Sequence, residues 1–338
     1  MIPTTSIKTV EPHTRKAIKP LYKTKSGRLY CGDSLSILKA RSLNRLKGKI
    51  DLVFTSPPFP LNRKKRYGNL QGEEYVQWLA SLAPVLTEFL TATGSIVIEL
   101  GNAWEPGQPT MSTLPIEALL AFKKAANLNL CQEFICFNPA RLPSPAQWVN
   151  VERIRVKDAF TRVWWLSATA TPKADNKKIL TKYSKSMQEL FKRGTYNAGL
   201  RPSEHNIGEK SFLTNNKGAI PPNVLVPPIE DMLPELTEVL SIANTFNSDL
   251  YQSECRLNDW PSHPARMPRK LVEFFVEFLT EPGDRVLDPF AGSNTTGAVA
   301  ESLLRKWVGI EMSPEYAETS KIRFGLPCKL PKGALATE

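Results

Sequence analysis

The chain has 338 residues, of which 41% are hydrophobic, and this is enough for a large globular domain with a second, smaller lobe. It carries 44 Lys and Arg against 33 Asp and Glu, so its net charge of +11 favours a phosphate-bearing partner. Its five cysteines form no C-x-x-C pair and its three histidines no H-x-x-x-H pair, so neither a disulfide framework nor a metal site is expected. No signal peptide or membrane-spanning run is recognisable, which favours a cytoplasmic protein.

Strand-like and helical patterns alternate in two separated regions. In the first region, β-rich runs occupy 51–55, 95–100, 130–137 and 159–167, and helical periodicity covers 73–91 and 113–127. In the second, a helix is expected over 268–279, followed by a strand at 284–288, a helix over 295–304 and a strand at 306–311. This alternation predicts an α/β fold with a doubly wound, mostly parallel sheet.

Residues 171–260, between these regions, are rich in Pro, Gly, Asn and Ser and show weak periodicity, which predicts an inserted lobe of loops and short elements. The lobe has two halves of opposite charge. Residues 171–217 carry a net charge of +6 and residues 218–260 a net charge of −6. A polyanion would therefore contact the first half.

The stretch DLVFTSPPFP at 51–60 runs from a buried strand directly into two prolines. Pro57 and Pro58 have no backbone N–H, so they offer only carbonyl acceptors on a rigid loop. Ser56 adds a hydroxyl acceptor and Phe59 adds a flat aromatic face. Such a loop can accept both hydrogen bonds of an exocyclic amino group while the ring stacks on the attached base.

The stretch DRVLDPFAGSNTTG at 284–297 is a strand followed by a small-residue turn that opens a helix. Backbone N–H groups at such a turn favour a carboxylate or a phosphate. Glu311 ends the next strand, about 20 residues after the glycine turn, where it can accept ribose hydroxyls from a nucleoside-containing cofactor. A tight turn without any ligand is the alternative reading of this pattern.

TSPPF, DPFAGSNTTG and the spacing to Glu311 resemble motifs IV, I and II of S-adenosylmethionine-dependent, amino-directed DNA methyltransferases. Their order is that of the β group, which implies a circularly permuted, Rossmann-like methyltransferase fold with an antiparallel edge hairpin and a smaller target-recognition lobe. Ser-Pro-Pro-Phe is typical of the cytosine-N4 branch, whereas adenine-N6 enzymes more often carry Asp-Pro-Pro-Tyr. The resemblance covers most of the chain, from GDSL at 32–35 to RKWVGIEMSPEY at 305–316.

The resemblance implies a role for each matching residue. Ser56 and the Pro57 carbonyl would accept the amino protons, with Pro58 in the same catalytic loop and Phe59 against the base. The expected contacts of S-adenosylmethionine are Asp33 at its adenine, Glu311 at its ribose, His263 and Pro264 near its carboxylate, Asp288 at the strand end, and Phe290, Gly292, Ser293, Asn294 and Thr295 around its methionine part. Many β-group members have Gly-Ser-Gly where this chain has Gly-Ser-Asn. Asn294 tolerates a left-handed backbone, but we expect it to add a side chain near the cofactor.

Double-stranded DNA is the expected partner, and two basic groups are candidates for contacting it. The first, Arg63, Lys64, Lys65 and Arg66, follows the catalytic loop; the second lies in the lobe and comprises Arg193, Arg201, Lys210 and Lys217. Phe137 aligns loosely with a motif VIII aromatic that can contact the target base, and core packing is its alternative.

We therefore expect a site-specific DNA methyltransferase that transfers a methyl group from S-adenosylmethionine to N4 of a flipped cytosine in the prokaryotic cytoplasm or nucleoid. No metal or membrane partner is expected; a cognate restriction endonuclease acting on the same site is a candidate partner. Adenine-N6 methylation and a catalytically silent DNA-binding regulator are the alternatives. The expected organisation is a catalytic half at 21–170, the lobe at 171–260, a cofactor-binding half at 261–325, and tails at 1–20 and 326–338.

Overall fold

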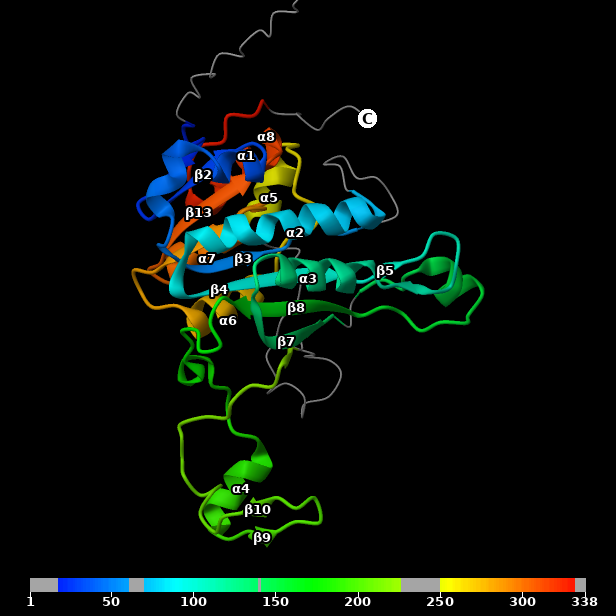
Figure 1. Cartoon of the computed structure of the whole chain (residues 1–338), viewed down its shortest axis with the longest axis vertical. Helices are drawn as coiled ribbons and strands as arrows, with labels where there is room; N and C mark the ends of the chain where they lie inside the picture. Colours follow the sequence, from blue (N-terminus) through cyan, green and yellow to red (C-terminus); the bar gives the residue numbers. More distant parts are fainter. Residues whose placement is uncertain (1–17, 61–69, 139–140, 226–249, 332–338) are drawn as a thin grey trace, which may run out of the picture.

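The computed structural model describes residues 18–60, 70–138, 141–225 and 250–331, and a nine-stranded sheet lies at its centre (Figure 1). In sheet order the strands are β1 (Tyr22–Lys23), β2 (Gly27–Cys31), β13 (Lys306–Glu311), β12 (Arg285–Asp288), β3 (Ile50–Thr55), β4 (Leu90–Gly101), β8 (Phe160–Ser167), β7 (Asn129–Phe137) and β11 (Val224–Leu225). The five strands from β2 to β4 are mutually parallel, and β8 is antiparallel to both β4 and β7. The predicted α/β fold, with its mostly parallel sheet and antiparallel hairpin, is confirmed. One addition is the two-residue β11, which pairs outside β7.

Helices cover both faces of this sheet. The described α-helices are α1 (Ser34–Leu38), α2 (Gly72–Phe89), α3 (Leu114–Ala125), α4 (Lys185–Arg193), α5 (Leu250–Leu257), α6 (Arg269–Leu279), α7 (Thr295–Ser302) and α8 (Pro314–Thr319). Shorter helical segments are the 3-10 helices η1 (Arg41–Leu46), η3 (Asn176–Ile179) and η4 (Ser320–Phe324) and the π-helix η2 (Gln147–Val151). The predicted helices over 73–91, 113–127, 268–279 and 295–304 correspond to α2, α3, α6 and α7.

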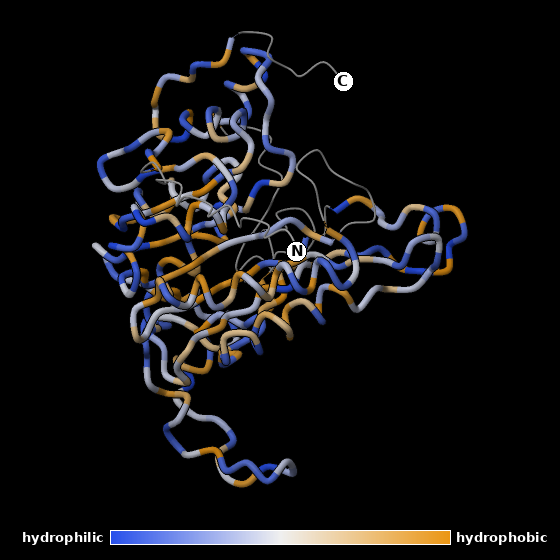
Figure 2. The backbone as a smooth tube through the Cα atoms, turned by 45° about the horizontal axis from the view of Figure 1, so that its top comes forward, coloured by the Kyte–Doolittle hydropathy of each residue, from blue (hydrophilic) through white to orange (hydrophobic). Residues whose placement is uncertain are grey.

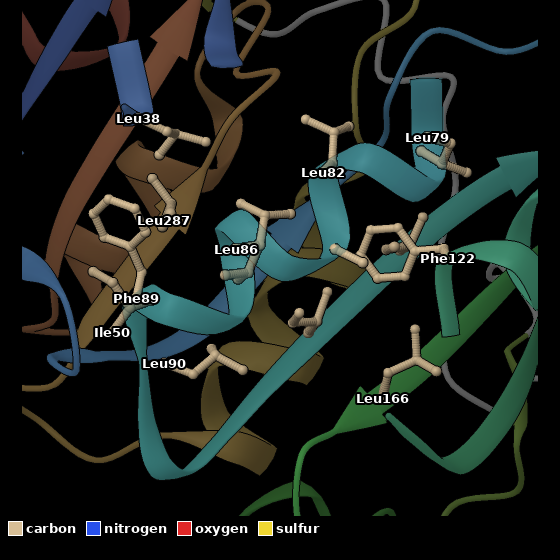
Figure 3. Close-up of a cluster of buried hydrophobic side chains, with 14 of the residues drawn as sticks. Leu38, Ile50, Leu79, Leu82, Leu86, Phe89, Leu90, Phe122, Leu166 and Leu287 are labelled. Atoms are coloured by element: carbon tan, nitrogen blue, oxygen red, sulfur yellow. The ribbon is translucent and has the colours of Figure 1, made fainter. Parts of the chain in front are cut away.

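The two faces of the sheet bury separate hydrophobic cores. Along β4, Ile96 and Ile98 belong to one core and Val97 to the other, because successive side chains of a strand point to opposite faces. Figure 3 shows the first core, in which Leu82, Leu86 and Phe89 of α2 lie over the sheet. The second core contains most of α6. Burial on both faces explains why β3 and β4 read as nearly continuous apolar runs.

Several described elements were not predicted. β2 is short and begins with a glycine, and the strand β1 paired with it has only two residues. The helices α1 and α8 have five and six residues, too few to show a helical period. β2 extends the parallel part of the sheet beyond β13, and β1 adds an antiparallel strand at its edge.

Part of the region between 171 and 260 projects from the sheet (Figure 1). Its base is closed by paired backbone bonds between Thr181 and Ala219, and the projection carries α4 and the hairpin of β9 (Gly199–Leu200) and β10 (Asn206–Ile207). We call residues 181–219 the projecting lobe. Figure 2 shows that it is largely hydrophilic. The flanking η3 and α5 bury Ile179, Tyr251 and Cys255 and so belong with the packed region.

A second, smaller projection leaves the sheet where β4 ends and β8 begins. It consists of the hairpin of β5 (Ala103–Trp104) and β6 (Met111–Ser112) together with η2 (Figure 1). Both projections therefore rise from the packed sheet region. Within the described residues, no helix is both long and apolar enough to cross a bilayer.

Candidate active site

The two motifs found in the sequence meet in one cavity of about 440 Å³. This cavity lies where β3, β12 and β13 end, and in a parallel sheet the carboxyl ends of the strands share an edge. Of the residues predicted to act in catalysis or cofactor binding, those that line it are Asp33, Ser56, Pro57, Pro58, Phe59, His263, Asp288, Phe290, Gly292, Ser293 and Glu311. Because motifs more than 200 residues apart (56 and 288, for example) line one cavity, they can act on the same pair of substrates.

The catalytic loop is held in place from two sides. The Tyr75 hydroxyl of α2 donates a hydrogen bond to the Pro58 carbonyl at 2.9 Å. The Phe59 ring lies directly on Gly101 at the end of β4: a Cβ atom there would lie 2.6 Å from Cε2 of Phe59. Gly101 therefore has to lack a side chain for the ring to occupy this position. Ser56 and Pro57, which directly precede these two anchored residues, line the cavity.

Glu99 of β4 lies beside the Ser56 hydroxyl, and both residues line a neighbouring cavity. Glu99 is buried and accepts a hydrogen bond from the Thr161 hydroxyl at 2.8 Å. Burial raises the pKa of the Glu99 carboxyl above its ordinary value, and the nearby Thr161 and Ser56 hydroxyls oppose that rise. A serine whose proton is directed to a carboxylate has only lone pairs left for a ligand. With the Glu99 carboxylate as its neighbour, Ser56 can act as a hydrogen-bond acceptor.

Glu311 closes the cofactor side of the cavity. One carboxylate oxygen accepts the Gly292 N–H at 2.7 Å, and the other accepts the Ser313 N–H at 2.8 Å. Burial raises the pKa of Glu311, while these backbone donors lower it. The two bonds fix the carboxylate between the glycine turn and the start of α8. It lines the cavity there, where lone pairs of its oxygens can still accept hydroxyl groups.

Gly292 allows the backbone to approach a ligand closely. Its φ of +52° lies in the left-handed region, and a Cβ would lie 3.0 Å from Nε2 of His263. His263 in turn packs edge-on against Tyr316, with ring centroids 4.8 Å apart. A side chain at position 292 would both strain the turn and displace the imidazole.

Asp288 joins the two motifs. Its Oδ1 accepts the Thr55 hydroxyl at 2.9 Å and the Phe290 N–H at 3.0 Å, and its Oδ2 accepts the Thr296 hydroxyl at 2.7 Å. Thr55 directly precedes Ser56, so a single carboxylate ties the strand that leads into the Ser-Pro-Pro-Phe loop to the glycine turn. Burial raises the pKa of Asp288 to about 6 despite these donors.

Three predicted cofactor contacts lie outside this cavity. Asn294 has the left-handed backbone expected of it, with a φ of +56°, but its side chain points into the protein. There it caps α7 by accepting the Gly297 N–H at 3.1 Å and donates to the Tyr22 hydroxyl at 2.9 Å. The expectation of an added side chain beside the cofactor is therefore not supported. Thr295 is buried in the first turn of α7, and Pro264 lines a neighbouring cavity.

Other residues contact or line the site although no sequence motif predicts them. Arg323 of η4 donates from Nε to the Ser293 carbonyl at 2.8 Å and from Nη2 to the Ser293 hydroxyl at 3.2 Å. Its guanidinium lies over the Tyr251 ring, and the Tyr251 hydroxyl accepts the His263 N–H at 3.0 Å. Tyr75 and Trp78 of α2 line the cavity. Such supports come from helices distant in sequence, so only the fold reveals them.

A second cavity of about 210 Å³ shares Ser56, Phe59, Ala265 and Met267 with the first. The remaining residues that line it are Glu99, Cys136, Asn138, Arg141, Phe160, Thr161, Pro264 and Arg266. Phe137, a candidate for contacting the base, does not line it, although its neighbours Cys136 and Asn138 do. Phe160, paired with Phe137 across the ladder, supplies the aromatic side chain instead.

The predicted DNA contacts are only partly visible. Arg63, Lys64, Lys65 and Arg66 lie outside the described residues. In the projecting lobe, Arg193, Lys210 and Lys217 are exposed and Arg201 is half-buried. None of these four forms an ion pair with a carboxylate in the described part of the chain. Their charge is therefore available to a polyanion.

The described residues contain no cluster of His, Cys, Asp and Glu suited to a metal ion. What they contain is a glycine turn at a helix N-terminus, an acid ending the next strand, and a proline-rich acceptor loop facing both. These features, on this sheet, define an S-adenosylmethionine-dependent methyltransferase. The groups present fit that cofactor: the missing Cβ of Gly292 leaves room for a ligand against the turn, and the Glu311 carboxylate is fixed at the end of the next strand, where it could accept ribose hydroxyls.

Comparison with known proteins narrows the class. The model of the N6- and N4-directed DNA methylase family matches residues 50–322, and the chain belongs to that family. The type II methyltransferase M.PvuII of Proteus hauseri is 44% identical over 308 residues, which cover 90% of this chain and 86% of the relative. The solved structure of PvuII DNA methyltransferase, described as cytosine-N4-specific, covers 93% of this chain and 92% of its own, with a TM-score of 0.69 and 39% identity. The DNA adenine methyltransferase YhdJ of Escherichia coli is 47% identical, but only over 60 residues, 18% of this chain and 20% of YhdJ.

Proposed function

We propose that this protein methylates the N4 amino group of a cytosine in duplex DNA. The observation that carries this proposal is the position of Ser56, which lies beside the buried Glu99 carboxylate and lines both cavities. The Ser-Pro-Pro-Phe loop and the 44% identity to M.PvuII support cytosine over adenine. S-adenosylmethionine supplies an electrophilic methyl group when it is bound.

The residues of this chain would prepare the amino nitrogen for attack. The lone pair of a cytosine amino group is delocalised into the ring, so the nitrogen is a poor nucleophile. Hydrogen bonds from its two N–H groups to Ser56 and the Pro57 carbonyl favour a pyramidal nitrogen whose lone pair is directed away from the ring. The double proline holds these acceptors at fixed angles.

Glu99 provides a route for the proton that leaves. When the nitrogen gains a methyl group it must lose one proton, and Ser56 accepts that proton as it passes its own to the Glu99 carboxylate. The nitrogen ends neutral, Ser56 is unchanged and Glu99 is protonated. Because burial raises the pKa of Glu99, its carboxylate is a better base than an exposed one.

The target base has to leave the double helix to reach this site, because its amino group is paired inside duplex DNA. Extrusion costs a few kcal/mol, and stacking on Phe59, which lines both cavities, offsets part of that cost. The basic side chains of the projecting lobe would contact the DNA, so we propose that the lobe selects the target sequence. A restriction endonuclease with the same site is a further proposed partner, since M.PvuII bears a type II name.

Product analysis tests the proposal. Purified protein is incubated with unmethylated duplex DNA of diverse sequence and S-adenosylmethionine, and the digested nucleosides are analysed by mass spectrometry. We expect N4-methylcytosine, and none in a parallel reaction without the cofactor. N6-methyladenine would overturn the assigned base but not the reaction. No methylated nucleoside would favour a silent DNA-binding regulator, against which the joint presence of Ser56, Gly292 and Glu311 in one cavity argues.

A further inference from the structure

The second cavity holds an arginine that the methyl-transfer step does not use. Arg141 lies between β7 and β8 and lines this cavity together with Ser56 and Glu99. It is close enough to Glu99 for its positive charge to lower the pKa of that carboxyl. A cation is therefore held beside the loop that receives the amino group.

One side of the Arg141 guanidinium is fixed by the protein and the other side is not. Its Nη1 donates to the Phe160 carbonyl at 2.9 Å and to the Asp158 carboxylate at 3.4 Å. Asp158 is itself held by Nδ2 of Asn102 at 2.8 Å. Among the described residues, Nε and Nη2 of Arg141 have no hydrogen-bond partner. Arg141 thus brings donors that the described protein groups do not use to a cavity large enough for part of a base.

The chemistry of the two candidate bases differs where such donors would meet them. Cytosine presents the amino group, the acceptor N3 and the acceptor O2 in sequence along its pairing edge. Adenine presents an amino group and the acceptor N1 but has a C–H group in place of O2. With the amino group on Ser56, a donor further along the edge would meet O2 in cytosine and a C–H group in adenine.

We propose that Arg141 is a specificity-determining residue that donates hydrogen bonds to the O2 and N3 edge of the flipped cytosine and disfavours adenine. This inference rests on the proposed function, since it assumes an amino group held at Ser56. A desolvated guanidinium facing a C–H group has unpaired donors, and sites built to hydrogen-bond a substrate strongly reject analogues that lack the acceptor. The Ser-Pro-Pro-Phe loop alone recognises only an amine, which both bases possess.

The experiment compares two duplexes that differ only in the target base. Once the modified site has been mapped, the target position carries either cytosine or adenine, in both cases opposite an abasic site, so that the cost of extrusion is similar. The value of kcat/KM for methyl transfer is measured for the wild type and for Arg141→Met, which keeps the length of the side chain and removes its donors. We expect a loss of roughly 10- to 100-fold on cytosine and no loss on adenine.

Matched variants separate base reading from other roles. Arg162→Met also removes an arginine paired with a carboxylate, Glu133 at 3.1 Å, but outside the cavity, and should leave the ratio of the two rates unchanged. Arg141→Lys keeps the charge and loses the planar fork, so it would restore a phosphate contact but not the preference for cytosine. Thermal unfolding of each variant without ligands reports whether it has folded.

The outcomes distinguish this inference from the proposed function. A selective loss on cytosine supports base reading by Arg141. Equal losses on both bases, or full rescue by lysine, would overturn it and indicate a phosphate contact or a purely structural role. A wild-type enzyme that prefers adenine would instead contradict the proposed function itself.

Discussion

The active-site edge of the sheet and the projecting lobe differ in how their polar groups are held. At the sheet edge, Asp288 and Glu311 are buried and each accepts several hydrogen bonds. In the lobe, α4 has no buried side chain, and the aromatic pairs Tyr183–Phe191 and Tyr196–Phe212 pack edge-to-face. The first region fixes atoms to a geometry, whereas the second displays charge on a small scaffold.

This contrast matches what the two parts of the reaction need. Methyl transfer depends on the position and direction of a few acceptors, and these are most accurately held on strands whose own side chains are packed. Recognition of a DNA sequence requires exposed donors and tolerates substitution, because loops and surface elements can change without disturbing a core. Substitutions at the edge should therefore alter chemistry or stability, and substitutions in the lobe should alter DNA affinity.

The strongest expected effect is that of Ser56→Ala at the sheet edge. This change removes one of the two acceptors for the amino group and the link to Glu99, so kcat should fall by roughly 10² to 10³. The affinity for S-adenosylmethionine, measured by calorimetry, should stay within twofold, because the glycine turn is untouched. Loss of cofactor binding together with activity would contradict the separation of the two halves of the site.

Asp288→Asn, at the same edge, should raise the stability of the protein and slow methyl transfer. Burial raises the pKa of Asp288 from its ordinary 3.8 to about 6, so the fold favours the neutral carboxyl and its ionisation costs stability as the pH rises through that window. The neutral amide avoids this cost, and at pH 7 the variant should be more stable by about 2 to 3 kcal/mol. It should also transfer methyl groups more slowly, because it removes a negative charge from the cavity.

Chemical denaturation of both proteins between pH 3.5 and pH 8 tests this prediction. The difference in the free energy of unfolding should be near zero below pH 3.8 and should grow as the pH rises through about 6. A difference that is independent of pH would show that Asp288 does not titrate in this window.

In the lobe, a triple change of Arg193, Lys210 and Lys217 to glutamine should weaken DNA binding without changing chemistry. If all three side chains contact phosphates, the slope of log affinity against log salt concentration should become shallower by about 0.9 for each contact. A substitution that alters preference at a single base position would instead identify a base-reading residue. The matched control changes Arg41, Arg45 and Lys49 to glutamine. These exposed side chains lie near the start of β3, opposite the end that carries Ser56.

The site was most predictable from the sequence where local residue patterns are unusual. A strand that runs into Pro57 and Pro58, and a glycine turn between strand and helix, are local features that make chemical sense without a fold. The long amphipathic helices and buried strands were equally recognisable, because their periods extend over many residues. These features predicted the sheet and most of the residues that line the cavity.

Residues that act through tertiary contacts left no such signal. Glu99 reads as part of the apolar run SIVIEL, and Arg141 as one more basic residue in a loop. Asn294 was expected beside the cofactor because sequence alone does not show that its side chain caps α7. Only the folded structure shows that Phe160, and not Phe137, lines the second cavity.

The smallest expected effects come from one chemical change made in each region. Tyr75→Phe removes the hydroxyl that donates to the Pro58 carbonyl at 2.9 Å, and Tyr183→Phe removes the lobe hydroxyl that accepts the Asn216 N–H at 2.8 Å. Each variant loses a single hydrogen bond worth about 1 kcal/mol, so the rate or affinity that depends on that bond should fall about fivefold. Tyr75→Phe should lower kcat and leave DNA affinity unchanged, because its bond orients the catalytic loop. Tyr183→Phe should weaken DNA binding and leave kcat at saturating DNA unchanged. Single-turnover kinetics and a DNA-binding titration on both variants measure the rate of methyl transfer and the DNA affinity. If Tyr75→Phe weakened DNA binding, or Tyr183→Phe slowed methyl transfer, catalysis and recognition would be coupled through the sheet.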